Sequence, residues 1–293
     1  MIDGLVVVDK EAGYTSHDVV ARCRRVFGQS KVGHAGTLDP GATGVLLIGL
    51  GKATRLLRFI GSGSKRYRGE LVLGASTTTL DASGEIVARF DMGGVDAGSV
   101  QRCAATLTGE IEQVPPMVSA KKVGGVRLHA LARQGLEVER PSSRVTVDSF
   151  EVAPLYPDGE GGSVFSFEVV CSAGTYVRTL VDDLGKLLGG GAHLRTLRRT
   201  ASGSFTAGEA RPVDAIAECD VLDLGEALRE MDQFVVGDEV AREIGFGRPI
   251  TLPTLGAETP GPWCLVAGDG RVLAVYERRG GQCRPAVVLE PAG

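Results

Sequence analysis

The sequence lacks the patterns that mark zinc-binding, disulfide-rich, membrane-spanning and P-loop proteins. Its six cysteines are scattered, form no CxxC pair and stand in no compact group with histidine, which argues against a zinc site and a disulfide framework. The longest apolar stretches, such as residues 45–50, are far shorter than the ~20 residues that a membrane span needs. No GKS or GKT follows the glycine-rich segments, which excludes a phosphate-binding P-loop. We therefore expect a soluble protein without a bound metal.

The first ten residues also lack the basic start and long apolar run of a signal peptide, and carry acidic Asp3 and Asp9 instead. Scattered single thiols fit a reducing compartment. Both observations predict a cytoplasmic protein.

Two features stand out among what is present. Glycine accounts for 42 of the 293 residues, about twice its average usage, and it follows no period, which indicates many tight turns. The length predicts about two domains. The net charge of −4 argues against a nucleic-acid partner, but residues 117–144 hold six Lys or Arg against two acids, and residues 193–199 add three arginines. An ordinary solvated surface explains these charges as well as an RNA-binding face does.

Hydrophobic patterning predicts a chain that mixes strands with helices. Strands are expected at 5–8, 45–50, 68–73 and 164–171, and helices at 52–60, 99–107 and 128–134. Ser16 is expected to cap a further helix, and another is expected after Gly174-Thr175. Residues 28–44 are predicted to form a polar loop. From Phe234 onward, short apolar runs alternate with Gly and Pro turns, as in a small β-barrel.

The most informative segment is GHAGTLDPGATG, from Gly33 to Gly44. Asp-Pro is a common turn pair, so a turn is the simpler interpretation of Asp39 from its chemistry alone. The alternative is that the glycines let a bulky ligand approach the backbone while His34 and Asp39 face it.

The segment from Gly33 to Arg55, GHAGTLDPGATGVLLIGLGKATR, strongly resembles the catalytic motif of the TruB family of pseudouridine synthases. The resemblance continues in order through KRY (65–67), VPPMVSAKK (114–122), LARQG (131–135), GTYVR (174–178), AHLR (192–195) and LRR (197–199). It spans roughly residues 5–205. In one departure, Glu11 follows Lys10 where the family typically has proline, which puts local loop rigidity in doubt.

The resemblance implies that the protein isomerises a uridine, at the position conventionally numbered 55 in the T-arm of transfer RNA, to pseudouridine. The reaction involves no net redox change and no hydrolysis, so we expect no cofactor. The resemblance makes Asp39 the catalytic carboxylate, Arg178 the cation that keeps it ionised, and Tyr67 the ring that stacks on the uracil. Without it, Arg178 would be interpreted as a surface residue and Tyr67 as a packing residue.

The resemblance also implies a set of RNA contacts. His34 would be a wedge that fills the space left by the extruded base, although a hydrogen-bonded loop histidine is the other interpretation. Residues 115–144 would act as a basic thumb on the RNA backbone. The other predicted contacts are Lys10, Lys65, Lys121, Lys122, Arg127, Arg133, His193, Leu194, Arg195, Arg198 and Arg199.

The predicted fold is an α/β (α+β) catalytic domain with a mixed, mainly antiparallel sheet over residues 1–233, plus a small PUA-like C-terminal β-barrel over 234–293. The barrel either contacts RNA or merely packs on the core. The predicted partner is the transfer-RNA T stem-loop, with no obligate protein partner, and the chain is expected to be monomeric. The alternatives are a guide-RNA-dependent synthase related to dyskerin and a non-catalytic RNA-folding chaperone. The basic segment at 115–144, which stand-alone members use, disfavours the first, and the retained Asp39, Tyr67 and Arg178 disfavour the second as the only role.

Overall fold

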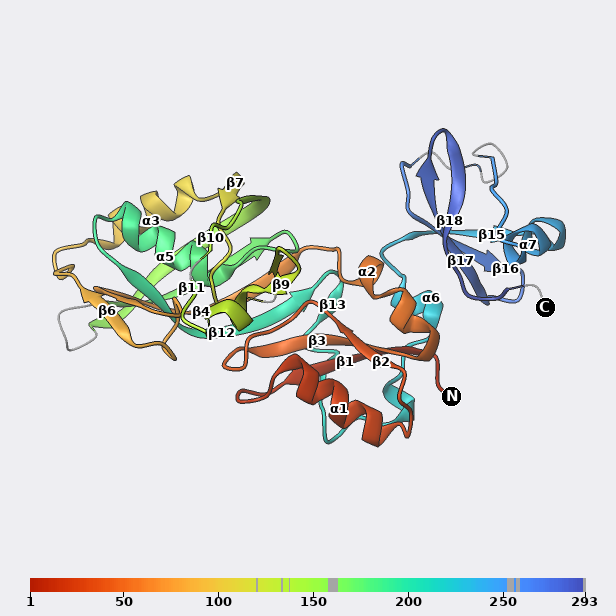
Figure 1. Cartoon of the computed structure of the whole chain (residues 1–293), viewed down its shortest axis with the longest axis horizontal. Helices are drawn as coiled ribbons and strands as arrows, with labels where there is room; N and C mark the ends of the chain where they lie inside the picture. The colour runs from red at the N-terminus through yellow and green to blue at the C-terminus, as the bar shows by residue number, and fades with distance from the viewer. Residues whose placement is uncertain are drawn as a thin grey trace.

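The computed structural model describes residues 1–119, 121–132, 134–136, 138–157, 163–251, 256 and 259–291. A large domain is built around a ten-stranded sheet, and a small C-terminal domain with its own sheet lies at one end of the molecule, beside α2 and α6 (Figure 1).

The large sheet has the strand order β14-β1-β3-β12-β4-β11-β10-β7, with β2 added to β3 and β13 to β12. Within the described residues its pairs are antiparallel, apart from β1 with β14 and β3 with β12. This is the mixed, mainly antiparallel sheet that the sequence predicts. Its strands are β1 (Gly4–Lys10), β2 (Val32–Ala35), β3 (Thr43–Leu50), β4 (Lys65–Leu73), β7 (Gly109–Gln113), β10 (Ser143–Pro157), β11 (Ser163–Cys171), β12 (Ala192–Ser202), β13 (Phe205–Thr206) and β14 (Arg211–Pro212).

Three amphipathic helices cover one face of this sheet and bury their apolar sides in one continuous core. They are α1 (Ser16–Val26), α3 (Ala97–Thr106) and α5 (Val177–Leu187). The shorter elements of the large domain are η1 (Gly51–Arg55), α2 (Leu57–Ile60), β5 (Ala75–Thr77), β6 (Ile86–Arg89), β8 (Lys122–Val123), β9 (Val126–Arg127), α4 (Leu128–Ala132), η2 (Glu218–Asp220) and α6 (Leu224–Ala227).

The two halves of the large sheet meet where β3 runs parallel to β12. The register pairs Thr43 with Arg198 and Gly44 with Arg199. Gly44 has φ +100°, and a Cβ built on it would lie 2.1 Å from the Arg199 carbonyl oxygen. Only glycine allows the two strands to approach this closely.

The C-terminal domain contains β15 (Asp232–Val236), α7 (Asp238–Gly245), β16 (Trp263–Ala267), β17 (Val272–Arg279) and β18 (Gln282–Val288). Its described strands form a four-stranded sheet in the order β15-β16-β17-β18, and an isolated bridge joins Ile250 to Cys283 of β18, which gives the small C-terminal β domain that the sequence predicts. The predicted boundary at 233/234 falls inside β15, whose first residue already belongs to this sheet. Ion pairs of Lys52 with Glu290 and of Arg58 with Glu277 join the two domains.

The expected strands and helices are present, with shifted ends and three differences. Thr15, rather than Ser16, caps α1, because Thr15 Oγ1 accepts the Asp18 N–H at 3.1 Å and Asp18 closes a capping box. Strand β2 lies within the segment predicted to be a loop, and β12 occupies a segment for which no strand is expected. Among the described residues, no helix has the length and apolar character to cross a membrane.

The β3–β12 junction predicts that Gly44→Ala destabilises the protein by about 2 kcal/mol or more, since the substitution combines left-handed backbone strain with overlap of the Arg199 backbone. Urea unfolding followed by circular dichroism measures the change. Gly41→Ala, with open space around the new Cβ and no positive φ, is the matched control and should leave stability unchanged. Equal stability of the two variants would contradict the prediction.

Candidate active site

Asp39 lies in the loop between β2 and β3, which is held in place from two sides. Ser16 Oγ accepts the Leu38 N–H at 3.0 Å and donates to the Leu38 carbonyl at 3.2 Å. The Gly13 N–H donates to the Pro40 carbonyl at 2.8 Å. Because Thr15 caps α1, Ser16 can make these contacts. The loop therefore presents the Asp39 carboxylate from a fixed backbone.

Arg178 is the second residue of α5 and forms a two-point ion pair with Asp39. Its Nε lies 2.9 Å from Asp39 Oδ2, and one terminal nitrogen donates to Oδ1 at 3.1 Å. The Arg178 side chain is 5% exposed, whereas that of Asp39 is 40% exposed. The carboxylate is thus oriented by a buried guanidinium while it stays accessible to a substrate.

Three further oxygens hold the Arg178 guanidinium. It donates to the Thr79 carbonyl at 3.0 Å and to the Val118 carbonyl at 2.8 Å, and lies 3.7 Å from Asp81 Oδ2. A cation near a helix N-terminus opposes the helix macrodipole, and these oxygens offset that cost. The Arg178 side chain is therefore held by three parts of the chain: the Asp39 loop, residues 79–81 and Val118.

Opposing influences set the pKa of Asp39. Burial raises the pKa of this carboxyl above its ordinary value and the Asp81 carboxylate adds to the rise, whereas Arg178 and Lys10 act to lower it. The net direction is upward, so Asp39 takes up its proton at a higher pH than an ordinary aspartate.

Asp39 and Arg178 line a cavity of about 380 Å³ together with Tyr67, Lys65 and Arg199. Tyr67, on β4, is 7% exposed, and burial raises the pKa of its phenol. The phenol therefore stays protonated and offers a flat ring and an O–H donor rather than a base. The structure brings the three predicted catalytic residues to one cavity.

Two predicted RNA-contacting lysines are buried instead. Lys10, 1% exposed, donates its ammonium to the carbonyls of Glu11, Tyr14 and Pro40, and Lys65, 4% exposed, donates to two carbonyls of the 61–63 turn. Burial lowers the pKa of each to about 8. Their donors tie loops together at the border of the site, and the RNA contacts predicted for them stay a prediction.

Arg199, another predicted RNA contact, is buried as well. This residue is 1% exposed, and its guanidinium donates to the Val45 carbonyl at 2.7 Å and to the Gly36 carbonyl at 2.8 Å. It links the two ends of the loop that carries Asp39 and also lines the Asp39 cavity, and the phosphate contact predicted for it stays a prediction.

The other predicted contacts on β12 are held by protein groups. His193 Nδ1 lies 3.0 Å from the Ala75 carbonyl, and Leu194 is 4% exposed at the edge of a small cavity that also reaches Asp39. Arg195 lies 3.7 Å from Glu70, and Arg198 forms a two-point pair with Asp9 at 2.7 and 2.9 Å.

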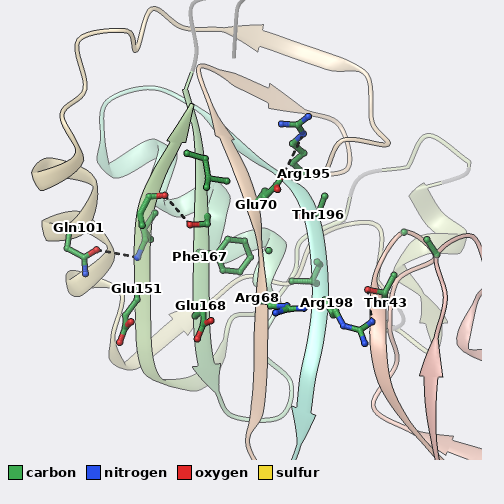
Figure 2. Close-up of a pocket in the computed structure, with 18 residues that line it drawn as sticks. Thr43, Arg68, Glu70, Gln101, Glu151, Phe167, Glu168, Arg195, Thr196 and Arg198 are labelled. Atoms are coloured by element: carbon green, nitrogen blue, oxygen red, sulfur yellow. Dashed lines mark hydrogen bonds and ion pairs between the residues drawn. The ribbon is translucent and has the colours of Figure 1, made fainter. Parts of the chain in front are cut away.

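Arg195 and Arg198 line a hollow of about 1030 Å³ that does not include Asp39, and Arg195 also lines the small cavity that reaches Asp39. Figure 2 shows both arginines along β12 in this hollow, with Glu151 and Glu168 at its other side. Within the 193–199 segment, Arg199 therefore faces the Asp39 cavity, whereas Arg198 faces the larger hollow.

His34 is half-buried on β2 beside His17, with ring centroids 5.3 Å apart and an edge-to-face arrangement. Burial lowers its pKa to about 4, so the ring is neutral at physiological pH. It does not line the cavity of Asp39.

In the predicted thumb, Lys121 donates to Ser143 Oγ, and Arg144 lies between Glu110 and Glu112 at 3.7 and 3.8 Å. Arg133 and the side chains of Lys122 and Arg127 lie outside the described residues. The described part of the chain holds no group of three or more His, Cys, Asp or Glu arranged for a metal ion.

Asp81 is a site residue that the sequence patterns do not identify. Its carboxylate is oriented by Thr79 Oγ1 at 2.6 Å and by the Ser83 N–H at 3.0 Å. Leu80, between them, has φ +62°, which is rare for a residue other than glycine. The polar run TTTLDASG offers a weak signal for such a loop, but the contact of Asp81 with Arg178 does not follow from it.

Three family models match consecutive parts of the chain. Residues 24–177 match the TruB family pseudouridylate synthase (N terminal domain), residues 178–235 the tRNA pseudouridylate synthase B C-terminal domain, and residues 231–290 the tRNA Pseudouridine synthase II, C terminal.

Curated relatives match over their whole length. The tRNA pseudouridine synthase B of Thermobifida fusca is 46% identical over 297 residues, which cover 99% of each chain. That of Arthrobacter sp. (strain FB24) is 45% identical over 302 residues, which cover 100% of this chain and 98% of the relative.

Among solved structures, a chain of a Cbf5-Nop10-Gar1 complex aligns with a TM-score of 0.73 and 24% identity, covering 98% of this chain and 85% of that one. At this identity the likeness establishes the fold alone. The family models and the curated relatives show that the chain belongs to the TruB family of pseudouridine synthases, which are isomerases.

Proposed function

We propose that the protein converts uridine to pseudouridine at position 55, in the T-arm of transfer RNA. The observation that carries the proposal is the Asp39–Arg178 ion pair, which supplies an oriented and accessible carboxylate in a cavity of about 380 Å³. Relatives named tRNA pseudouridine synthase B, 45–46% identical over nearly their whole length, support transfer RNA as the substrate.

The chemistry is an intramolecular transfer. The bond between the ribose C1′ and the uracil N1 breaks, the uracil turns within the cavity, and C1′ bonds to C5. C5 releases its proton to water, and N1 takes up a proton in exchange. Atoms and electrons balance without an oxidant or a reductant, so the reaction needs no cofactor. Asp39 supplies the carboxylate, Arg178 keeps it ionised and oriented, and Tyr67 forms a flat wall for the uracil.

The uridine has to leave the stacked T-arm before it can reach Asp39, at a cost of a few kcal/mol. We assign His34 as the wedge that replaces the extruded base, because a neutral, half-buried ring stacks without the desolvation cost of a charge. The 115–144 segment contacts the RNA backbone, and the C-terminal domain adds RNA contacts. Transfer RNA is the partner, the protein acts as a monomer without a protein partner, and its substrate places it in the cytoplasm.

Asp39→Asn should abolish conversion of an unmodified T-arm stem-loop, by about 10³-fold or more, while RNA binding persists. A tritium-release assay without guide RNA, protein partner or cofactor measures conversion, and filter binding measures affinity. Asp148→Asn, at an exposed aspartate on β10 that does not line the cavity, should convert like wild type.

Wild-type activity in the Asp39→Asn variant would overturn the role of the carboxylate. If wild-type protein binds the stem-loop without converting it, a guided synthase becomes the better interpretation. The chaperone hypothesis gains support if the Asp39→Asn protein still promotes RNA folding fully.

Asp81→Asn should move the acid limb of the single-turnover pH–rate profile to lower pH. The Asp81 carboxylate raises the pKa of Asp39, so its removal lets Asp39 ionise at a lower pH, while Arg178 is still held by the Thr79 and Val118 carbonyls. Glu85→Gln, at an exposed carboxylate of the same loop, is the control and should leave the limb in place. A shift to higher pH would show that Asp81 acts chiefly by holding Arg178.

A further inference from the structure

The start of α5, which carries Arg178, has no side-chain cap of its own. The N-cap residue is Tyr176, whose side chain does not bond to the first free N–H groups of the helix. An uncapped helix start is less well fixed, typically by about 1 kcal/mol. Arg178 stands two residues further on, so any movement of this turn displaces the guanidinium.

Gln113 supplies the missing anchor from a distant part of the chain. Its Oε1 accepts the Tyr176 N–H at 2.7 Å, and its Nε2 donates to the Tyr176 carbonyl at 3.1 Å. Gln113 is the last residue of β7, is 2% exposed, and lies 63 residues before Tyr176 in the sequence. The pair reproduces the two-point pairing of neighbouring β-strands and fixes both the place and the orientation of the Tyr176 backbone.

The same segment also holds the other end of Arg178. Five residues after Gln113, the Val118 carbonyl accepts from the Arg178 guanidinium at 2.8 Å. Residues 113–118 therefore contact both the backbone from which Arg178 projects and the charged group that meets Asp39.

We propose that Gln113 is a positioning residue for the reaction, which sets the Arg178 guanidinium against the Asp39 carboxylate by clamping the Tyr176 backbone. This inference rests on the proposed function in that it takes the Asp39–Arg178 pair as the reacting site. In this proposal the buried Gln113 amide touches no substrate, yet it controls the geometry of the Asp39–Arg178 pair.

The chemistry of the amide explains why glutamine is needed at this place. A primary amide offers one acceptor and two donors in a single plane, so it can satisfy the N–H and the carbonyl of one residue together. Gln113→Glu keeps the size and the acceptors but loses the donor to the Tyr176 carbonyl. Gln113→Met keeps the approximate length and loses both bonds, which leaves the Tyr176 N–H without this partner, while the Tyr176 carbonyl keeps the Leu180 N–H.

For both variants we expect the single-turnover rate at saturating RNA to fall, on the order of 10²-fold for Gln113→Met, with RNA affinity unchanged. The acid limb of the pH–rate profile should move to higher pH. The sign follows because Arg178 lowers the pKa of Asp39, so a displaced guanidinium lets that pKa rise.

Gln101→Met is the matched control, because Gln101 also bonds to a backbone group, accepting the Val152 N–H at 3.2 Å (Figure 2), and does not line the cavity of Asp39. It should lower stability without moving the rate or the acid limb. If Gln113 only holds β7 to α5 and does not position Arg178, the Gln113 variants will lose stability but keep the wild-type rate and acid limb, as Gln101→Met does.

The closing experiment measures the ionisation of Asp39 directly and needs no substrate. The Asp39 carboxyl is titrated by ¹³C NMR in the free protein, in wild type, Gln113→Met, Gln113→Glu and Gln101→Met. A higher Asp39 pKa in the Gln113 variants but not in Gln101→Met supports the proposal, even if the T-arm substrate turns out to be wrong. An Asp39 titration identical in all four proteins overturns it, even if wild type converts the T-arm. Gln113→Glu keeps the test decisive if Gln113→Met does not fold.

Discussion

The contact between β3 and β12 at Gly44 and Arg199 is the constraint on which the rest of the site depends. It joins the half of the sheet that carries the Asp39 loop to the half that carries Tyr67. Gly44 permits the approach because it has no Cβ, and the Arg199 side chain then bonds to carbonyls on both sides of the loop, at Gly36 and Val45. The loop cannot move relative to β12 without breaking buried, charge-assisted hydrogen bonds.

Two buried lysines near Asp39 also restrict the movement of the backbone around the site. Lys10 and Lys65 each donate to backbone carbonyls of turns that border the site, and their pKa values fall to about 8 because burial disfavours the charged form. Burying a cation is costly unless its donors are satisfied, so each lysine demands a turn that offers several carbonyls to it. Glu11 contributes one of these carbonyls through its backbone, so this contact does not depend on the Glu11 side chain.

The sequence predicted the strands and helices with strong periodicity, and it predicted Asp39, Tyr67 and Arg178 through the family motif. It could not predict β2, because four residues that include Gly33 and His34 carry no strand pattern. Nor could it separate cations that meet RNA from those that hold the fold. Arg198 and Arg199 are neighbours in one motif, yet one pairs with Asp9 on the open face of the sheet and the other is enclosed beside Asp39. Strand alternation sends them to opposite faces, and that follows only once β12 is known to be a strand.

This division of the basic residues bears on how RNA would be held. Lys10, Lys65 and Arg199 are buried, and Arg195 and Arg198 are paired with carboxylates, so five of the predicted RNA contacts are already engaged within the protein. Counterion release scales with the number of phosphates that a protein neutralises. With these five engaged and a net charge of −4, the proposed function requires RNA affinity to come in larger part from the shape of a folded RNA and from an extruded base in the cavity. A site built in this way selects a folded RNA with one removable base over a bare polyanion, which is the discrimination that modification of a single uridine requires.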